Sequence, residues 1–171
     1  MTNTLQHIIE KMQHDNDACL QFLSNISEKQ FVEKPAKGWS IAEILEHVVL
    51  TEKMIFLMLS RRSNEQDNPL FVLGEKNLEE KLIQGREKKL QAPEALQPKG
   101  TLTSRAAGEE AFLEMRHRYL QALQSQHIAL NQGIHKHPFL GAMSVADWLY
   151  FIMLHRQRHF LQAKENLQEL F

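Results

Sequence analysis

The chain has 171 residues, 43% of them hydrophobic, which suits one core, so we expect residues 1–171 to form a single domain. Lys and Arg total 20 against 21 Asp and Glu, a formal net charge of -1 at pH 7, and the lack of a basic excess argues against nucleic acid or an anionic membrane as a partner. The single cysteine excludes an internal disulfide, and the start of the chain does not resemble a signal peptide. No apolar run approaches the roughly 18 residues that span a bilayer. We therefore expect a cytoplasmic protein.

Two long helices are predicted in the first third of the chain. Apolar residues recur at three- and four-residue steps from about Thr4 to about Asn25, as on one buried helical face. Residues 27–39 show no sustained period and contain proline and glycine, which predicts a connection with one short helical turn. Ser40-Ile41-Ala42-Glu43 then has the form of a capping box, so a second helix begins there and extends to about Ser60.

A longer and more polar connection follows, from Arg61 to Leu102. Prolines and glycines interrupt it. Within it, residues 77–89 (NLEEKLIQGREKK) can form a short charged helix with Asn77 as its N-cap. Its charges are more simply a solvated face than a docking surface.

Two further long helices are predicted in the second half of the chain. The first of them follows Thr103 or Ser104 and ends before Gly133. A linker with glycines and a proline separates it from the last helix, for which Ser144 is the predicted N-cap and which runs to about Leu167.

The only strand candidate is the short Phe71-Val72-Leu73, so the predicted fold class is all-α. Four helices of about 20 residues suit a four-helix bundle, with a short extra helix in the second-to-third connection. That connection is long enough for a crossover, so an up-down-up-down order is not implied.

Histidine is the residue type that a functional interpretation must explain, since the chain has nine of them against two Trp, two Tyr and one Cys. Neutral imidazole is the commonest metal ligand and also carries protons near neutral pH. His155 and His159 lie four apart on the last predicted helix and can share one metal ion. Because roughly half of one such pair is expected by chance, the spacing alone favours two ordinary helix histidines.

The place of these histidines on their helices favours a role as ligands. On a helical projection both lie at the border of the apolar arc that contains Trp148 and Phe160. The same projection puts His47 on the flank of the apolar stripe of the second helix, in line with Thr51. Both helices therefore offer imidazoles that lean toward the interior yet stay within reach of a substrate.

Three histidines suit a first-row divalent ion such as zinc or nickel and leave one position open for water or substrate. His155-Arg156-Gln157-Arg158-His159 lacks the glutamate of H-E-x-x-H, so a metalloprotease is not supported. The two arginines favour an anionic substrate, although Arg158 is more simply a solvated charge. Arg156 lies inside the apolar arc and is expected to pair with a carboxylate.

Three parts of the chain resemble the DinB-like superfamily. The segment 38–47 (GWSIAEILEH) is similar to its W-S-x-x-E-x-x-x-H motif, and the similar C-terminal part is His137-Pro138-Phe139-Leu140-Gly141, Ser144, Asp147-Trp148, His155 and His159. Ala92-Pro93-Glu94 and Pro98 resemble its middle loop. The resemblance covers most of the chain in order, and implies a four-helix bundle of up-down-down-up connectivity, often a homodimer, that holds a divalent metal through His47, His155 and His159.

The reaction is less well defined by this resemblance. Some members are thiol S-transferases that activate a low-molecular-weight thiol on the metal, one branch isomerises a ring-cleavage product with a thiol cofactor, and others are classed as hydrolases. The resemblance thus implies a metal-dependent transferase or hydrolase with a small-molecule substrate. The alternative is a non-catalytic dimeric helical protein that binds metal or serves a stress response, with Met54, Leu57 and Met58 as its dimer face.

Other side chains are candidates for lining the site or supporting its ligands. Glu43 lies one turn before His47 and can hold its second ring nitrogen, although the capping box is the simpler role. Trp148 is more simply core, and Gln162 and Asn166 share the stripe of the histidine pair. The full set of candidates around the metal is Glu43, Thr51, Trp148, Arg156 and Gln162.

Three remaining features are weighed against simpler explanations. His137 can approach the site as a fourth ligand or proton donor, or can shape its loop together with Pro138. Cys19 lies on an apolar helical face and is more simply a small buried residue than a nucleophile. Glu114 and His117 fit the E-x-x-H motif of di-iron bundles, but such a site needs two motifs and the chain has one, which excludes a ferritin-like protein.

Overall fold

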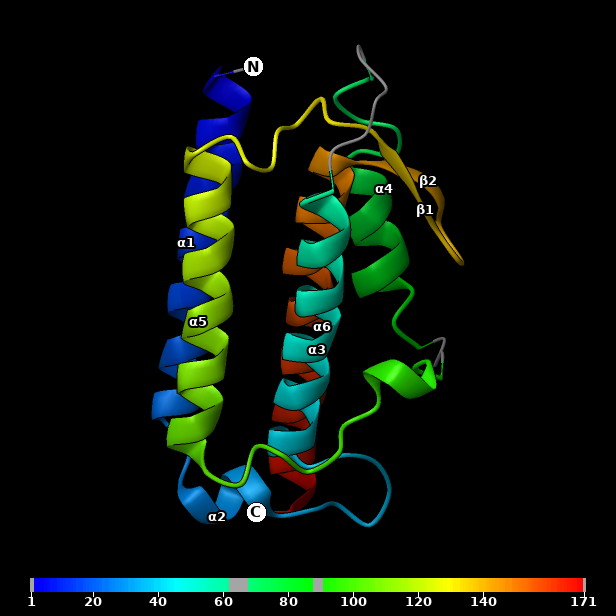
Figure 1. Cartoon of the computed structure of the whole chain (residues 1–171). Helices are drawn as coiled ribbons and strands as arrows, with labels where there is room; N and C mark the ends of the chain where they lie inside the picture. The colour runs from blue at the N-terminus through cyan, green and yellow to red at the C-terminus, as the bar shows by residue number, and fades with distance from the viewer. Residues whose placement is uncertain (1, 62–67, 88–90, 171) are drawn as a thin grey trace.

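The computed structural model describes residues 2–61, 68–87 and 91–170. Four long helices dominate this part of the chain: α1 (Thr2–Ser24), α3 (Ile41–Leu59), α5 (Arg105–Gln124) and α6 (Val145–Leu170). They lie side by side along one axis (Figure 1), and α1 and α3 each pack against both α5 and α6. The prediction of four long helices is therefore confirmed, with ends that differ by a few residues.

Serine side chains begin the helices as the sequence predicts. At α3, Ser40 Oγ accepts from the Glu43 amide and Glu43 Oε2 accepts from the Ser40 amide, which completes the capping box. Ser104 caps α5 in the same way through the Ala107 amide. The short turn predicted within residues 27–39 is α2 (Glu28–Val32), with its own capping box at Ser27. These bonds satisfy amides that no intrahelical carbonyl can reach.

Contacts between the long helices show their relative directions. Leu45 lies against Gly108 and the Glu52 carbonyl accepts from Tyr119, so residue numbers rise together and α3 and α5 run the same way. By contrast, Asn166 on α6 donates to the Trp39 carbonyl just before α3, whereas Arg156 contacts Glu52 farther along α3. The helices α1 and α6 therefore run opposite to α3 and α5, as Figure 1 shows.

A two-stranded hairpin corrects the all-α prediction. Strands β1 (Ile134–His137) and β2 (Gly141–Ser144) pair antiparallel in the linker before α6, with Ile134 opposite Ser144. Strands of four residues are too short to show an alternating pattern, and their glycine and proline read as loop signals. The strand candidate Phe71-Val72-Leu73 is not a strand, because the amides of Val72 and Leu73 donate to the Asp147 carboxylate.

The short helix in the second-to-third connection begins earlier than predicted. It consists of α4 (Glu75–Glu79), followed by one π-helical turn, η1 (Glu80–Gln84). Asn77 is not its N-cap but lies inside it, where its side chain donates back to the Leu73 carbonyl. Of the predicted range 77–89, residues 88 and 89 lie outside the described residues. A single 3-10 turn, η2 (Glu94–Leu96), comes later in the same connection.

The interior between the long helices contains two apolar clusters with charged groups at intermediate positions. One cluster includes Met12 and Ile55, the other Cys19 and Leu45. Between these levels lie the charged side chains of Asp15 on α1, Glu52 on α3, Arg116 on α5 and Arg156 on α6. Among the residues described, no helix combines the length and the hydropathy that a membrane span needs.

Candidate metal centre

Three histidines from two helices converge in the structure. His47 is in the second turn of α3, and His155 and His159 occupy consecutive turns of α6. Each offers a nitrogen atom, and these three atoms all lie within 4.8 Å of one another. The Nε2 atoms of His155 and His159 are 3.2 Å apart. Within the described parts of the chain, no other group of His, Cys, Asp or Glu side chains meets in this way.

The orientation of His47 is fixed by a backbone carbonyl. Its Nδ1 lies 2.7 Å from the Leu96 oxygen in η2, and since a carbonyl can only accept, Nδ1 carries the ring proton and donates it. The Nε2 atom is therefore left with a lone pair. Glu43 does not support His47, because its carboxylate binds the Ser40 amide and the Lys34 ammonium instead. The capping box is thus the role that the structure gives to Glu43.

His159 is oriented in a similar way by a side chain. Its Nδ1 lies 3.1 Å from Gln162 Oε1, and donation to that oxygen again leaves Nε2 as the unprotonated nitrogen. Burial, with a smaller contribution from the nearby His47, lowers the pKa of His159 to about 3. Burial also lowers the pKa of His47 and that of His155, the latter strongly and with help from the other two histidines. At neutral pH all three rings are neutral and can act as ligands.

The donor set fits a divalent transition metal. Zinc bonds to imidazole nitrogen at about 2.0–2.1 Å, so two ligand atoms in a tetrahedral site lie about 3.3 Å apart. The separation of 3.2 Å between His155 Nε2 and His159 Nε2 agrees with this spacing. Three neutral imidazoles that point their lone pairs at one centre repel one another unless a cation or proton lies between them. Imidazole sets of this kind suit zinc, nickel, copper or iron rather than calcium or magnesium.

Aromatic rings surround the three histidines. The Trp39 ring lies 5.1 Å from that of His47, and the Phe151 ring stacks on His155 at 5.3 Å. Trp148 is buried, contacts Phe151 at 5.4 Å and donates from Nε1 to the His135 carbonyl. His47 is buried, whereas His155 and His159 are partly exposed as whole residues. The site combines aromatic neighbours with two partly exposed histidines on α6.

The two arginines next to the histidine pair are bound elsewhere. Arg156 is fully buried and pairs with Glu52 and Asp15, which confirms the expected carboxylate partner but turns the side chain away from a role in the metal pocket. Arg158 donates to the carbonyls of Leu82 and Arg86, where it caps the end of the π-helical segment. The prediction that these arginines favour an anionic substrate therefore loses its support.

The remaining candidates occupy different surroundings. Thr51 is buried one turn beyond His47, and its hydroxyl makes no hydrogen bond within the described residues. His137 Nδ1 accepts from the amides of Phe139 and Leu140, so it shapes the hairpin turn, and it does not join the metal-ligand group. Asn166 holds the segment before α3 through the Trp39 carbonyl.

Two buried carboxylates were not recognised from the sequence. Glu46, next to His47, accepts from the amides of Lys99, Gly100 and Thr101 and from the Thr101 hydroxyl. Asp147 accepts from the amides of residues 72–74 and of Ser144. Both bind loops that are distant in sequence. A charged residue at a position expected to be buried was the available signal, as it was for Arg156.

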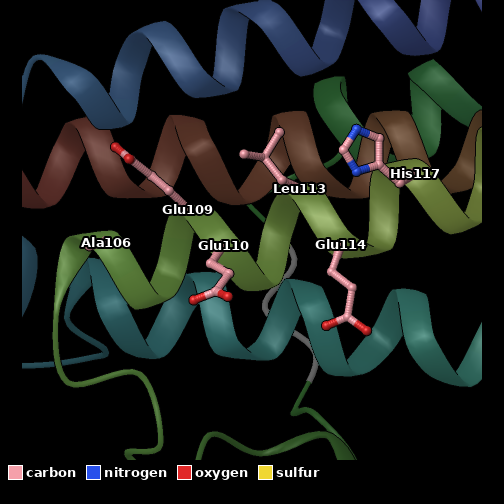
Figure 2. A pocket seen from close by; sticks show the side chains of 6 residues that line it. All are labelled: Ala106, Glu109, Glu110, Leu113, Glu114 and His117. Carbon is pink, nitrogen blue, oxygen red and sulfur yellow. The ribbon is translucent and has the colours of Figure 1, made fainter.

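An open cleft elsewhere does not compete with the histidine cluster. It lies along the outer face of α5, and Figure 2 shows its lining: Ala106, Glu109, Glu110, Leu113, Glu114 and His117. All six belong to one helix, and Glu109 and Glu114 are paired with Arg105 and Arg118. The Glu114 and His117 motif is therefore part of a solvated surface.

Comparisons with known proteins agree with the geometry. A family model described as the DinB superfamily matches residues 12–163, a range that includes all three histidines. The uncharacterized protein YuaE of Bacillus subtilis (strain 168) is 30% identical over 149 residues, which cover 86% of this chain and 90% of that protein. No solved structure matches the chain.

Proposed function

The chain belongs to the DinB superfamily, and from that premise we propose that it is a divalent-metal-dependent enzyme, a thiol S-transferase that acts on a small electrophile. In this proposal His47, His155 and His159 hold zinc or nickel, and a low-molecular-weight thiol or water occupies the open position. We further propose that residues 1–171 form one domain, a four-helix bundle of up-down-down-up connectivity, in the cytoplasm. The opposed directions of α1 and α6 against α3 and α5 support that connectivity.

One observation carries the proposal: three neutral imidazoles converge with two of their Nε2 lone pairs fixed inward, and no fourth ligand joins them among the described residues. A structural metal would be closed by a fourth protein ligand, whereas a catalytic one keeps a position open. The partial exposure of His155 and His159 supports an open position.

A divalent metal bound here supplies a Lewis acid that lowers the pKa of a thiol or of water toward neutrality. In the proposed transfer, the thiol sulfur forms a bond to the electrophilic carbon and its proton passes to solvent. The leaving group departs with the electron pair of the broken bond. The protein's own side chains orient the metal ligands and exclude bulk water from one side of the site.

The surroundings favour a substrate with an apolar body. Trp39 lies next to His47, Phe151 stacks on His155, and Trp148 packs against Phe151. Both arginines of the segment are engaged in other bonds. The chain has only two tryptophans, and both belong to this group. Ligand binding is therefore expected to change the intrinsic tryptophan fluorescence.

Metal content and thiol transfer test the proposal. Purified protein is expected to carry or take up one equivalent of zinc or nickel by mass spectrometry, and His47→Ala, His155→Ala and His159→Ala to lose it. His117→Ala, an exposed histidine on α5, is the matched control and is expected to keep it. Unchanged metal in all three ligand variants overturns the site. Metal-loaded protein is then given monobromobimane with a panel of thiols, and no metal-dependent rate with any of them overturns the transferase.

A second candidate is a non-catalytic dimer that binds metal or serves a stress response. It is favoured by Met54 and Leu57, which are 45% and 56% exposed on the outer side of α3 and offer an apolar face to a second copy. The homodimer is part of this proposal and compatible with the first. Sedimentation of the wild type and of Leu57→Glu tests it: a dimer that becomes a monomer supports the face, and a monomeric wild type excludes it.

A further inference from the structure

The loop formed by residues 94–101 lies against α3 and supplies the bond that orients His47. The Leu96 carbonyl at its start accepts from His47 Nδ1 at 2.7 Å, and η2 contacts α3. The bond determines which ring nitrogen carries the proton and so leaves Nε2 free toward the other two histidines. The position of Leu96 is therefore a condition for the geometry of the site.

The carboxylate of Glu46 binds the other end of this loop. Glu46 Oε1 accepts from the Lys99 amide at 3.0 Å and from the Thr101 hydroxyl at 2.8 Å. Its Oε2 accepts from the amides of Gly100 at 2.9 Å and Thr101 at 3.0 Å. Gly100 has φ of +74°, a left-handed conformation that favours glycine and that turns successive amides toward one acceptor.

Glu46 and His47 are neighbours in sequence but point in different directions. Successive side chains on a helix diverge by about 100°, so His47 faces the other ligands while Glu46 faces the loop. Glu46 is only 4% exposed, and all four of its bonds go to three consecutive loop residues. Leu96 lies only three residues before Lys99. Because this connection is short, the bonds that hold residues 99–101 also limit where the Leu96 carbonyl can lie.

We propose that Glu46 is a positioning residue for the metal centre: by holding residues 99–101 it places the Leu96 carbonyl, which in turn keeps His47 in the tautomer with a free Nε2. This inference rests on the proposed metal site. The inference goes beyond the proposed site because it assigns the orientation of His47 to a carboxylate that is not one of the three proposed ligands.

Asp147 provides a matched control within the same molecule. It too is a fully buried carboxylate near the start of a long helix, and it too accepts bonds from a distant loop, through the amides of Val72, Leu73 and Gly74. None of the described hydrogen bonds joins residues 72–74 to a histidine of the site. If buried carboxylates matter only for folding, Glu46 and Asp147 should be equivalent toward zinc.

Two measurements on Glu46→Gln and Asp147→Asn test the proposal. In the metal-free protein, long-range ¹H–¹⁵N spectra of the histidine rings report the tautomer. We expect His47 to be protonated at Nδ1 in the wild type and in Asp147→Asn, and to show a mixture of tautomers in Glu46→Gln. Zinc affinity, measured by competition with a chelator, is expected to fall about 10- to 100-fold in Glu46→Gln and to stay near the wild-type value in Asp147→Asn.

Thr101→Val keeps the test informative if Glu46→Gln does not fold. Thr101 is exposed, and this change removes one of the four bonds to Glu46 while leaving its charge in place. A partial shift of the His47 tautomer with a smaller loss of zinc affinity is the expected result. An unchanged tautomer in both Glu46→Gln and Thr101→Val, or equal losses of affinity in Glu46→Gln and Asp147→Asn, overturns the inference. A wild type that binds no zinc refutes the proposed function instead, because the tautomer measurement needs no metal.

Discussion

Two polar clusters lie between the long helices, and they differ in how their groups are satisfied. The charged cluster takes Asp15, Glu52, Arg116 and Arg156 from all four long helices, and its cations and anions bind one another. The histidine cluster comes from two helices, is neutral, and directs lone pairs at a shared centre. Charged groups that bind one another hold helices together, whereas neutral imidazoles that meet at one point can bind a cation.

The difference extends to the surroundings of each cluster. Arg116 and Arg156 are almost fully buried, and both guanidinium groups lie over the Phe112 ring at 5.1 Å. The histidines instead have partial access to solvent through His155 and His159. A closed cluster with internal charge compensation suits a structural role, and an open one suits exchange of a ligand. Variants that disrupt one cluster and spare the other test this division of roles.

The largest expected effect comes from breaking the charged cluster. Glu52→Ala removes the carboxylate that Arg116 and Arg156 share, and an uncompensated buried charge costs about 3–5 kcal/mol. Urea denaturation of the wild type and the variant gives the difference in the free energy of unfolding. Glu114→Ala, which breaks an exposed pair with Arg118, serves as the control and should cost less than about 1 kcal/mol. Equal losses in the two variants would show that the buried cluster is not structural.

The next largest effect is the stabilisation of the folded protein by zinc bound at the histidine cluster. A ligand that binds only the folded state stabilises it, by about 2.7 kcal/mol at a free concentration 100 times its Kd. Zinc is therefore expected to raise the unfolding free energy of the wild type and of Glu52→Ala alike, but not that of His155→Ala. Urea denaturation with and without zinc is the measurement. If zinc stabilises His155→Ala as much as it stabilises the wild type, zinc does not bind at the histidine cluster.

The charged and histidine clusters also differ in what the sequence predicted. The pair of His155 and His159 and the caps at Ser40, Ser104 and Ser144 depend on spacing along one helix, which the sequence contains. A carboxylate for Arg156 was expected from burial alone, but its identity as Glu52 and Asp15 depends on how three helices rotate about their axes. Local periodicity does not specify those rotations.

The loops were the least predictable part. The bond from Leu96 to His47 joins residues 49 positions apart, and the bonds from Asp147 to residues 72–74 join still more distant segments. Neither η2 nor the hairpin of β1 and β2 has a periodic pattern long enough to detect. The sequence therefore predicted which three histidines converge, whereas the hydrogen bonds of Glu46 and Leu96 could be found only from the fold.

A smaller effect is expected from pH in the metal-free protein. Burial lowers the pKa of His159 from 6.5 to about 3, so between these values the unfolded chain holds a proton that the folded chain does not. Stability contributed by the neutral ring is then complete above pH 6.5 and is lost as the pH falls through this window, by about 1.4 kcal/mol per pH unit. Urea denaturation of the wild type and of His159→Gln from pH 7 to pH 5 tests this. Parallel stability curves for the two proteins would contradict it.

The smallest effect tests whether the capping box at the start of α3 or the Leu96 carbonyl orients His47. Ser40→Ala removes the side-chain half of the capping box, and loss of such a cap costs about 1 kcal/mol. Zinc affinity should nevertheless stay unchanged, because His47 is held by the Leu96 carbonyl and not by the first turn of the helix. Ser27→Ala, at the equivalent box of α2, is the control for a cap far from the ligands in sequence. If Ser40→Ala weakens zinc binding as much as Glu46→Gln does, the start of the helix rather than the loop orients His47. The histidine cluster would then depend on the stability of its helix, as the charged cluster depends on the packing of the helices.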